Sequence, residues 1–171
     1  WPLHAPEKSI QKYLPRYQGG WEKLRNERYA RMLKMGIIDK ERFPLPPLED
    51  RVKPWDTIDH KPWRIRNMAI YAAMVDHMDQ AMGNIVDALQ RTKQFDNTLI
   101  IYFHDNGSCP EHLGGNAYNT ANNILESAKK AGKTVAVGDH FDVPMGGPLT
   151  YGSVGHNWAA FAGLVQAHLL V

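Results

Sequence analysis

The pair Asp105-Asn106 offers one carboxylate oxygen donor and one carboxamide oxygen donor at neighbouring positions. Oxygen donors of this kind suit calcium or magnesium better than zinc. Calcium takes about six to eight oxygens, so two side chains would need further ligands from elsewhere. The alternative is a simple turn, because turns commonly use the sequence Asp-Asn-Gly. From the residues alone, the turn is the favoured interpretation.

Two further groups of residues are weighed as sites and set aside. Ser153 lies in the segment Tyr151-Gly152-Ser153-Val154-Gly155, which superficially resembles a nucleophile elbow. A true Gly-x-Ser-x-Gly elbow needs a strand before it and a helix after it. Residues 145–148 indicate a loop, so we predict that Ser153 is not a nucleophile. Zinc ranks below both the turn and the hard cation, because the spacings fit no structural zinc pattern. The residues considered for zinc are His104, Cys109, His112, His140, Asp142 and His156.

A long helix and a strand would position Asp105 and Asn106. Apolar residues recur every three or four positions over about 64–92, which predicts a helix with a methionine-rich stripe packed in the core. Residues 98–103 (Thr-Leu-Ile-Ile-Tyr-Phe) predict a buried parallel strand. This order indicates an α/β fold, in which ligands bind at the carboxyl ends of strands. The Asp-Asn pair falls at such an end.

Charge is unevenly distributed along the chain. Residues 1–42 carry ten Lys and Arg against five Asp and Glu, and could attract an anionic partner. A helix is predicted over about 21–35, and its basic residues are expected on a solvated face rather than on a nucleic-acid surface. These basic residues are Lys23, Arg25, Arg28 and Arg31.

Two stretches are predicted to be irregular. The proline-rich residues 43–63 indicate a surface loop, which we expect Trp55 and Trp63 to hold in place. Residues 107–157 are expected to be mostly loop, interrupted by a short helix over about 120–131. A loop region of this length in a compact domain is often functional.

The composition indicates one globular domain. The chain has 171 residues, 43% of them hydrophobic, with a net charge of +2, which does not suit a disordered chain. The single Cys excludes an internal disulfide framework. Residues 159–171 are too short and too polar for a membrane span, and no leader is visible at residue 1.

Four segments carry a family resemblance, in matching order along the chain. They are residues 1–6 (Trp-Pro-Leu-His-Ala-Pro), 71–83, 96–107 and 151–159. Together they resemble the type I sulfatases, in particular bacterial arylsulfatases. The resemblance implies an alkaline-phosphatase-like α/β sandwich that hydrolyses sulfate monoesters.

In that family, a formylglycine made from Cys or Ser in a C/S-x-P-x-R motif attacks the sulfur. Calcium and lysines bind the sulfate oxygens, and a His protonates the leaving alcohol. Asp105 and Asn106 match the family's Asp-Asn metal pair, which implies calcium, with magnesium as the alternative. Asn106 favours sulfate esters, because related zinc phosphatases and phosphodiesterases have His at that place.

The chain also departs from the family pattern. No C/S-x-P-x-R occurs in it, and the Asp-Asp ligands, the leaving-group His and the lysines have no match, so we assign no catalytic residue. His4 is not given the leaving-group role. Residues 160–165 differ from the family's Thr-Pro-Phe-Arg continuation, which a frameshift would explain. We expect 1–171 to be a single partial catalytic domain, lacking its N-terminal and C-terminal portions and inactive alone.

Two alternatives stay open. One is a phosphodiesterase or phosphonate hydrolase of the same superfamily, and the other is a non-catalytic cation-binding module. The expected partner is a sulfate ester, with no nucleic acid and no membrane span. The resemblance implies a periplasmic or secreted full-length protein, and the sequence does not indicate the oligomeric state. An unpaired strand over 98–103 would favour aggregation.

Overall fold

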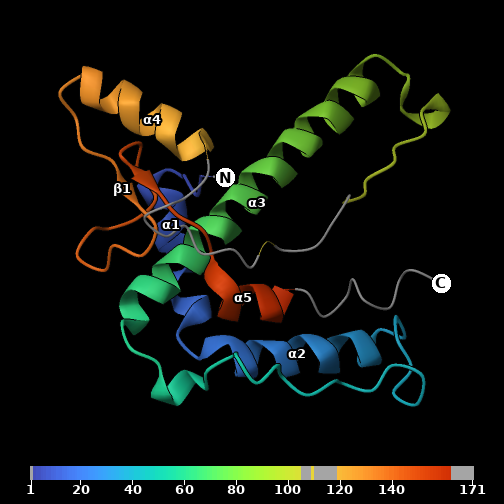
Figure 1. Cartoon of the computed structure of the whole chain (residues 1–171). Coiled ribbons are helices and arrows are strands. Elements are labelled where there is room, and N and C mark those ends of the chain that lie inside the picture. The colour runs from blue at the N-terminus through green and yellow to red at the C-terminus, as the bar shows by residue number, and fades with distance from the viewer. Residues whose placement is uncertain (1, 105–108, 110–118, 163–171) are drawn as a thin grey trace.

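The computed structural model describes residues 2–104, 109 and 119–162 (Figure 1). Its described part is mostly helical, with one small parallel sheet of two strands, β1 and β2. None of the described helices is long and apolar enough to cross a membrane. In chain order the elements are α1 (Glu7–Tyr13), η1 (Leu14–Tyr17), α2 (Gly20–Lys34), η2 (Trp55–Thr57), α3 (Lys61–Arg91), η3 (Phe95–Asn97), α4 (Asn119–Lys130), β1 (Ala136–Val137), β2 (Thr150–Tyr151) and α5 (Gly155–Ala162).

The longest element, α3, runs diagonally through the molecule (Figure 1). It begins after His60, whose φ of 51° turns the chain into the helix, and has Pro62 in the first turn, where the missing N–H leaves no bond unmade. The ring of His60 stacks on Phe141, with ring centroids 3.8 Å apart. The predicted helix over 64–92 is thereby confirmed, with a start three residues earlier.

The first half of α3 contributes to two adjoining cores. The first core lies between α3 and α1 and contains Leu3, Ile10, Trp63, Ala69, Ile70, Ala73 and Met145. The second core lies beside α2 and α5 and contains Trp21, Leu24, Val52, Trp55, Ile58, Met68 and Trp158. Both Trp55 and Trp63 are buried, which confirms that they hold the loop at 43–63.

The second half of α3 is uncovered. After Ala73, no residue of this helix is buried in the described structure, and Met78 and Ile85 are 40% and 52% exposed. The prediction that the whole methionine-rich stripe packs in the core is therefore wrong beyond Ala73. The physical reason is that α1 meets this part of the helix through polar side chains, Ser9 at His77 and Lys12 at Asp76, and not through an apolar face. The rest of the helix projects away from the other elements (Figure 1).

The predicted buried strand at 98–103 is also absent from the described structure. Its backbone leaves η3 in an extended conformation, but no described segment pairs with it. Leu99 and Phe103 are 84% and 77% exposed. A strand needs a neighbour to supply its hydrogen bonds, and none of the described segments provides one. Of the predicted helix followed by a strand, the structure thus confirms the helix and not the strand.

Two predicted helices are confirmed, with one correction on their charges. α2 and α4 match the helices expected over 21–35 and 120–131 to within one residue. The solvated basic face on α2 is wrong for Arg25, which is 7% exposed and donates a hydrogen bond to the Pro46 carbonyl. It is also wrong for the half-buried Arg28, which donates to the Phe161 carbonyl. Each guanidinium group bonds a backbone carbonyl of the fold, which offsets part of the cost of burying its charge.

The four short elements α1, β1, β2 and α5 were not predicted. The stretch 107–157, expected to be mostly loop, contains both strands as well as α4. Two-residue strands and seven- or eight-residue helices are too short for a hydrophobic period to mark them.

Candidate functional site

The N-terminal segment and β2, which are far apart in the sequence, lie side by side. The Leu3 N–H donates to the Gly152 carbonyl at 3.3 Å, and the Ala5 N–H donates to the Gly146 carbonyl at 3.2 Å. On its other side β2 pairs in parallel with β1. Two of the four segments that carry the family resemblance, 1–6 and 151–159, therefore meet beside β2. We call this region the β2 junction; it comprises residues 2–5 and 145–153.

His4 closes the β2 junction. Its Nε2 lies 2.7 Å from the carbonyl oxygen of Thr150. A carbonyl oxygen can only accept, so Nε2 carries the proton and donates it to this bond. The side chain therefore holds two segments together.

Arg66, in α3, forms hydrogen bonds that connect the β2 junction with α3 and α1. Its Nε donates to the Met145 carbonyl at 2.6 Å, and its two terminal nitrogens bond the carboxylate oxygens of Glu7 at 3.0 and 2.6 Å. Such a bidentate ion pair between a guanidinium and a carboxylate is directional as well as strong. The bonds from Arg66 and Gln11 lower the pKa of Glu7 to about 2. One guanidinium thus joins α3, α1 and the loop before β2.

Asn67 and Ser153 form the buried floor of the junction. Asn67 is fully buried, and its Nδ2 donates to the Ser153 carbonyl at 3.2 Å. Residues 145–148 form bends and turns, as predicted, while the two-residue strand β2 and the helix α5 stand on either side of Ser153. The burial of Ser153 is a second argument against a nucleophile elbow. Ser153 is 6% exposed, whereas an elbow serine must present its hydroxyl to substrate.

The predicted metal pair, Asp105 and Asn106, lies outside the described residues. The described chain leads up to it through Tyr102, whose hydroxyl is 3.8 Å from the Met78 sulfur and 2.9 Å from His104 Nε2. This contact fixes the approach of the chain to the second half of α3.

The zinc candidates are not brought together where the structure describes them. Among the described residues, no three His, Cys, Asp or Glu side chains are placed to hold a metal. Phe141, between His140 and Asp142, packs between His60 and Trp63. The stretch around Phe141 thus serves in packing. His112 lies outside the described residues.

The hydrogen bond from His4 to Thr150 and the bonds from Arg66 to Met145 and Glu7 were not predicted from the sequence. His4 and Thr150 are 146 positions apart, and Arg66 and Glu7 are 59 apart. No local pattern links such residues. The only available signal was the order of the four segments, which places residues 1–6 and 151–159 in one domain.

Comparison with known proteins agrees with this order of segments. A family model described as Sulfatase matches residues 2–142, and the chain therefore belongs to the sulfatase family. It is 36% identical over 110 residues to an uncharacterized sulfatase of Schizosaccharomyces pombe. It is 30% identical over 149 residues to an arylsulfatase of Klebsiella aerogenes. Membership implies the alkaline-phosphatase-like α/β fold.

The matches cover much of this chain but little of its relatives. They include 63% and 82% of this chain. Of the yeast and Klebsiella proteins they include 20% and 31%. The chain thus spans less than a third of the length of these relatives.

Proposed function

We propose that this chain is part of the catalytic domain of an arylsulfatase-like sulfuric ester hydrolase. The observation that carries the proposal is the Sulfatase match over residues 2–142. The β2 junction supports it, because segments from both ends of the chain converge there on α3. In the proposed enzyme these elements belong to the alkaline-phosphatase-like sandwich.

Asp105 and Asn106 are the proposed metal ligands. Their carboxylate and carboxamide oxygens fit a hard cation, and calcium is the proposed ion, with magnesium as the alternative. Bound there, the cation would supply fixed positive charge for the polyanionic sulfate ester. Residues outside this chain would provide the remaining ligands and the formylglycine. The two side chains are proposed to hold and orient the cation, and we propose that the 171 residues alone do not turn over substrate.

The test uses the longest open reading frame that contains these residues. Its product should hydrolyse 4-nitrophenyl sulfate faster than 4-nitrophenyl phosphate, and the activity should fall on chelation of calcium. Asp105→Ala should abolish it, whereas Asp96→Ala, in the turn before residues 98–103, should not. Faster phosphate hydrolysis would replace this proposal with the phosphodiesterase alternative.

A frame that encodes no more than this chain leads to a different expectation. The polypeptide should then be inactive and should bind calcium weakly, with Asp105→Ala removing the binding. Tight calcium binding without turnover would favour the cation-binding module. Turnover of the sulfate ester by the purified chain would refute its proposed inactivity.

A further inference from the structure

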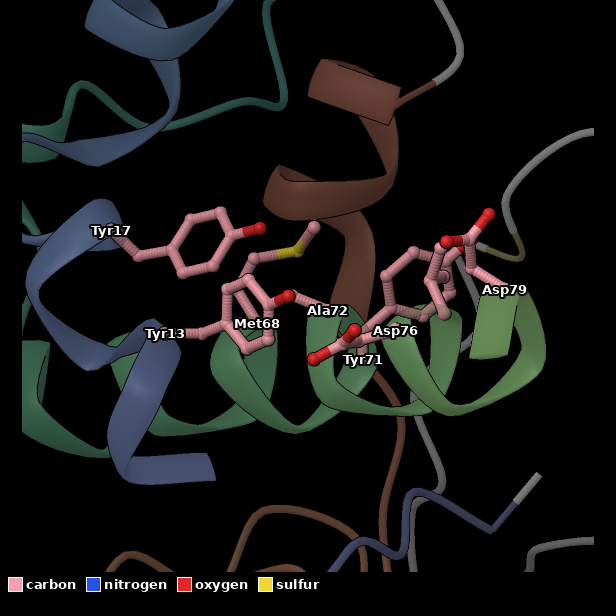
Figure 2. A pocket seen from close by; sticks show the side chains of 8 residues that line it. Tyr13, Tyr17, Met68, Tyr71, Ala72, Asp76 and Asp79 are labelled. Atoms are coloured by element: carbon pink, nitrogen blue, oxygen red, sulfur yellow. The ribbon is translucent and has the colours of Figure 1, made fainter. Parts of the chain in front are cut away.

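A groove lined by tyrosines and aspartates lies between α3 and the α1–η1 segment. We call it the tyrosine groove; it has a volume of about 400 Å³ and is lined mainly by Tyr13, Tyr17, Met68, Tyr71, Asp76 and Asp79. Figure 2 shows Tyr13 and Tyr17 projecting toward α3, with Asp79 at the opposite end of the groove from Tyr17. A volume of this size suits a small organic molecule. None of the residues that line the groove belongs to the β2 junction.

The rim of the groove already binds a cation, which belongs to the chain itself. The Lys12 ammonium lies 2.7 Å from Asp76 Oδ2 and 5.0 Å from the centre of the Tyr13 ring. This is the pairing of a carboxylate with an aromatic face that proteins use to bind ammonium groups. Hydrogen bonds from Lys12, Gln80 and Tyr13 lower the pKa of Asp76 to about 2, so it stays charged. Asp76 is thereby neutralised by Lys12.

Asp79, one helical turn further along α3, is not neutralised. Within the part of the chain that the structure describes, its carboxylate has no hydrogen bond and no ion pair. The groove therefore carries an unbalanced negative charge at this end. At the other end lie Met68 and the ring of Tyr17, which packs edge-on against Trp158. Burial raises the pKa of Tyr17, which keeps that surface uncharged.

These features together select one class of ligand. Anions are disfavoured by the Asp79 carboxylate, and one unpaired carboxylate among aromatic rings is too few ligands for a metal ion. From Met68 to Asp79 the helix rises by about 16 Å, long enough for an apolar body beside a charged head. We propose that the tyrosine groove binds an organic monocation with an aryl or alkyl body, its ammonium at Asp79 and its body between Tyr17 and Tyr71.

Three probes of one shape separate charge from apolar contact. They are 4-phenylbutylammonium, the uncharged 4-phenylbutanol and the anion 4-phenylbutyrate, each titrated into the labelled 171-residue chain at low salt and followed by amide NMR. The ammonium should saturate with a Kd of order 1 mM or below, and should bind about five- to tenfold more tightly than the alcohol. The butyrate should bind most weakly. Shifts should concentrate at Tyr13–Tyr17 and along residues 68–79.

Two matched variants locate the charge. Asp79→Asn should remove the preference for the ammonium over the alcohol, while Asp87→Asn, which removes the same charge from α3 outside the groove, should leave it unchanged. Tyr71→Leu should weaken the ammonium and the alcohol alike. The dispersion of each spectrum reports whether the variant is folded.

Several results would overturn the proposal. They are equal binding of the ammonium and the alcohol, an unchanged preference in Asp79→Asn, equal losses in Asp79→Asn and Asp87→Asn, and no saturable shift with the ammonium. None of these measurements involves sulfate ester hydrolysis, so the outcome is independent of the proposed enzyme activity.

Discussion

Gly146 holds the β2 junction closed, and its replacement by alanine should be costly for two reasons. Its φ of 110° lies in a region that side chains with a Cβ rarely adopt, and enforcing left-handed backbone on such a residue costs about 1–2 kcal/mol. A Cβ there would also lie 2.9 Å from Ile10 Cδ1 and 3.0 Å from Ile70 Cδ1. Both isoleucines are buried, so their neighbours resist the shift that would relieve this contact. Overpacking of this kind costs about 1–3 kcal/mol.

The summed destabilisation of Gly146→Ala is then about 2–5 kcal/mol, against about 5–15 kcal/mol for a whole domain. Urea unfolding followed by tryptophan fluorescence measures it. Gly36→Ala is the matched control, because Gly36 also has a positive φ, of 69°, but nothing lies within 4 Å of the added Cβ. We expect the control to lose only the backbone part. Equal losses in the two variants would refute the reasoning that the isoleucines resist the methyl group.

Two further predictions concern acid stability and the uncovered surface. The ion pair with Arg66 lowers the pKa of Glu7 from 4.5 to about 2, so the stabilisation it gives is present above about pH 4.5 and is lost as the pH falls toward 2. The difference in unfolding midpoint between the unsubstituted chain and Glu7→Gln should therefore shrink from pH 7 to pH 3. A constant difference would contradict this. Ile101, which is 69% exposed, should tolerate Ile101→Lys: self-association measured by light scattering should fall, and the unfolding midpoint should not. Ile70→Ala in the core, by contrast, should lower the free energy of unfolding by about 2–5 kcal/mol. A large loss of stability in Ile101→Lys would show that residues 98–103 are packed.

Elements with a long hydrophobic period were predictable from the sequence. The helices α2, α3 and α4 follow from apolar residues at helical spacing, and the positions of Trp55 and Trp63 follow from the proline-rich loop that they hold. Shorter elements had no such signal. A two-residue strand such as β2 exists because neighbouring segments supply its hydrogen bonds, and no property of its own residues records this.

The two errors on α3 and on residues 98–103 have one physical cause. A periodic or continuous apolar pattern says that a face can be buried, but it does not say which element buries it. In the described structure, the stripe on α3 is covered as far as Ala73, where α1 and the loop before β2 reach it, and is open beyond. Leu99 and Phe103 lie open for the same reason.

In the candidate site, too, residues adjacent in the sequence could be predicted, and contacts between residues distant in the sequence could not. Asp105 and Asn106 could be found in the sequence because they are adjacent and match a family motif. The contacts of His4 and Arg66 could not, because each joins residues that meet only after the chain has folded around α3. A cluster that depends on such distant contacts is sensitive to any change that separates the segments. Gly146 is such a point, since its carbonyl accepts a hydrogen bond from the Ala5 N–H. The side chains of Ile10 in α1 and Ile70 in α3 lie where a Cβ would stand.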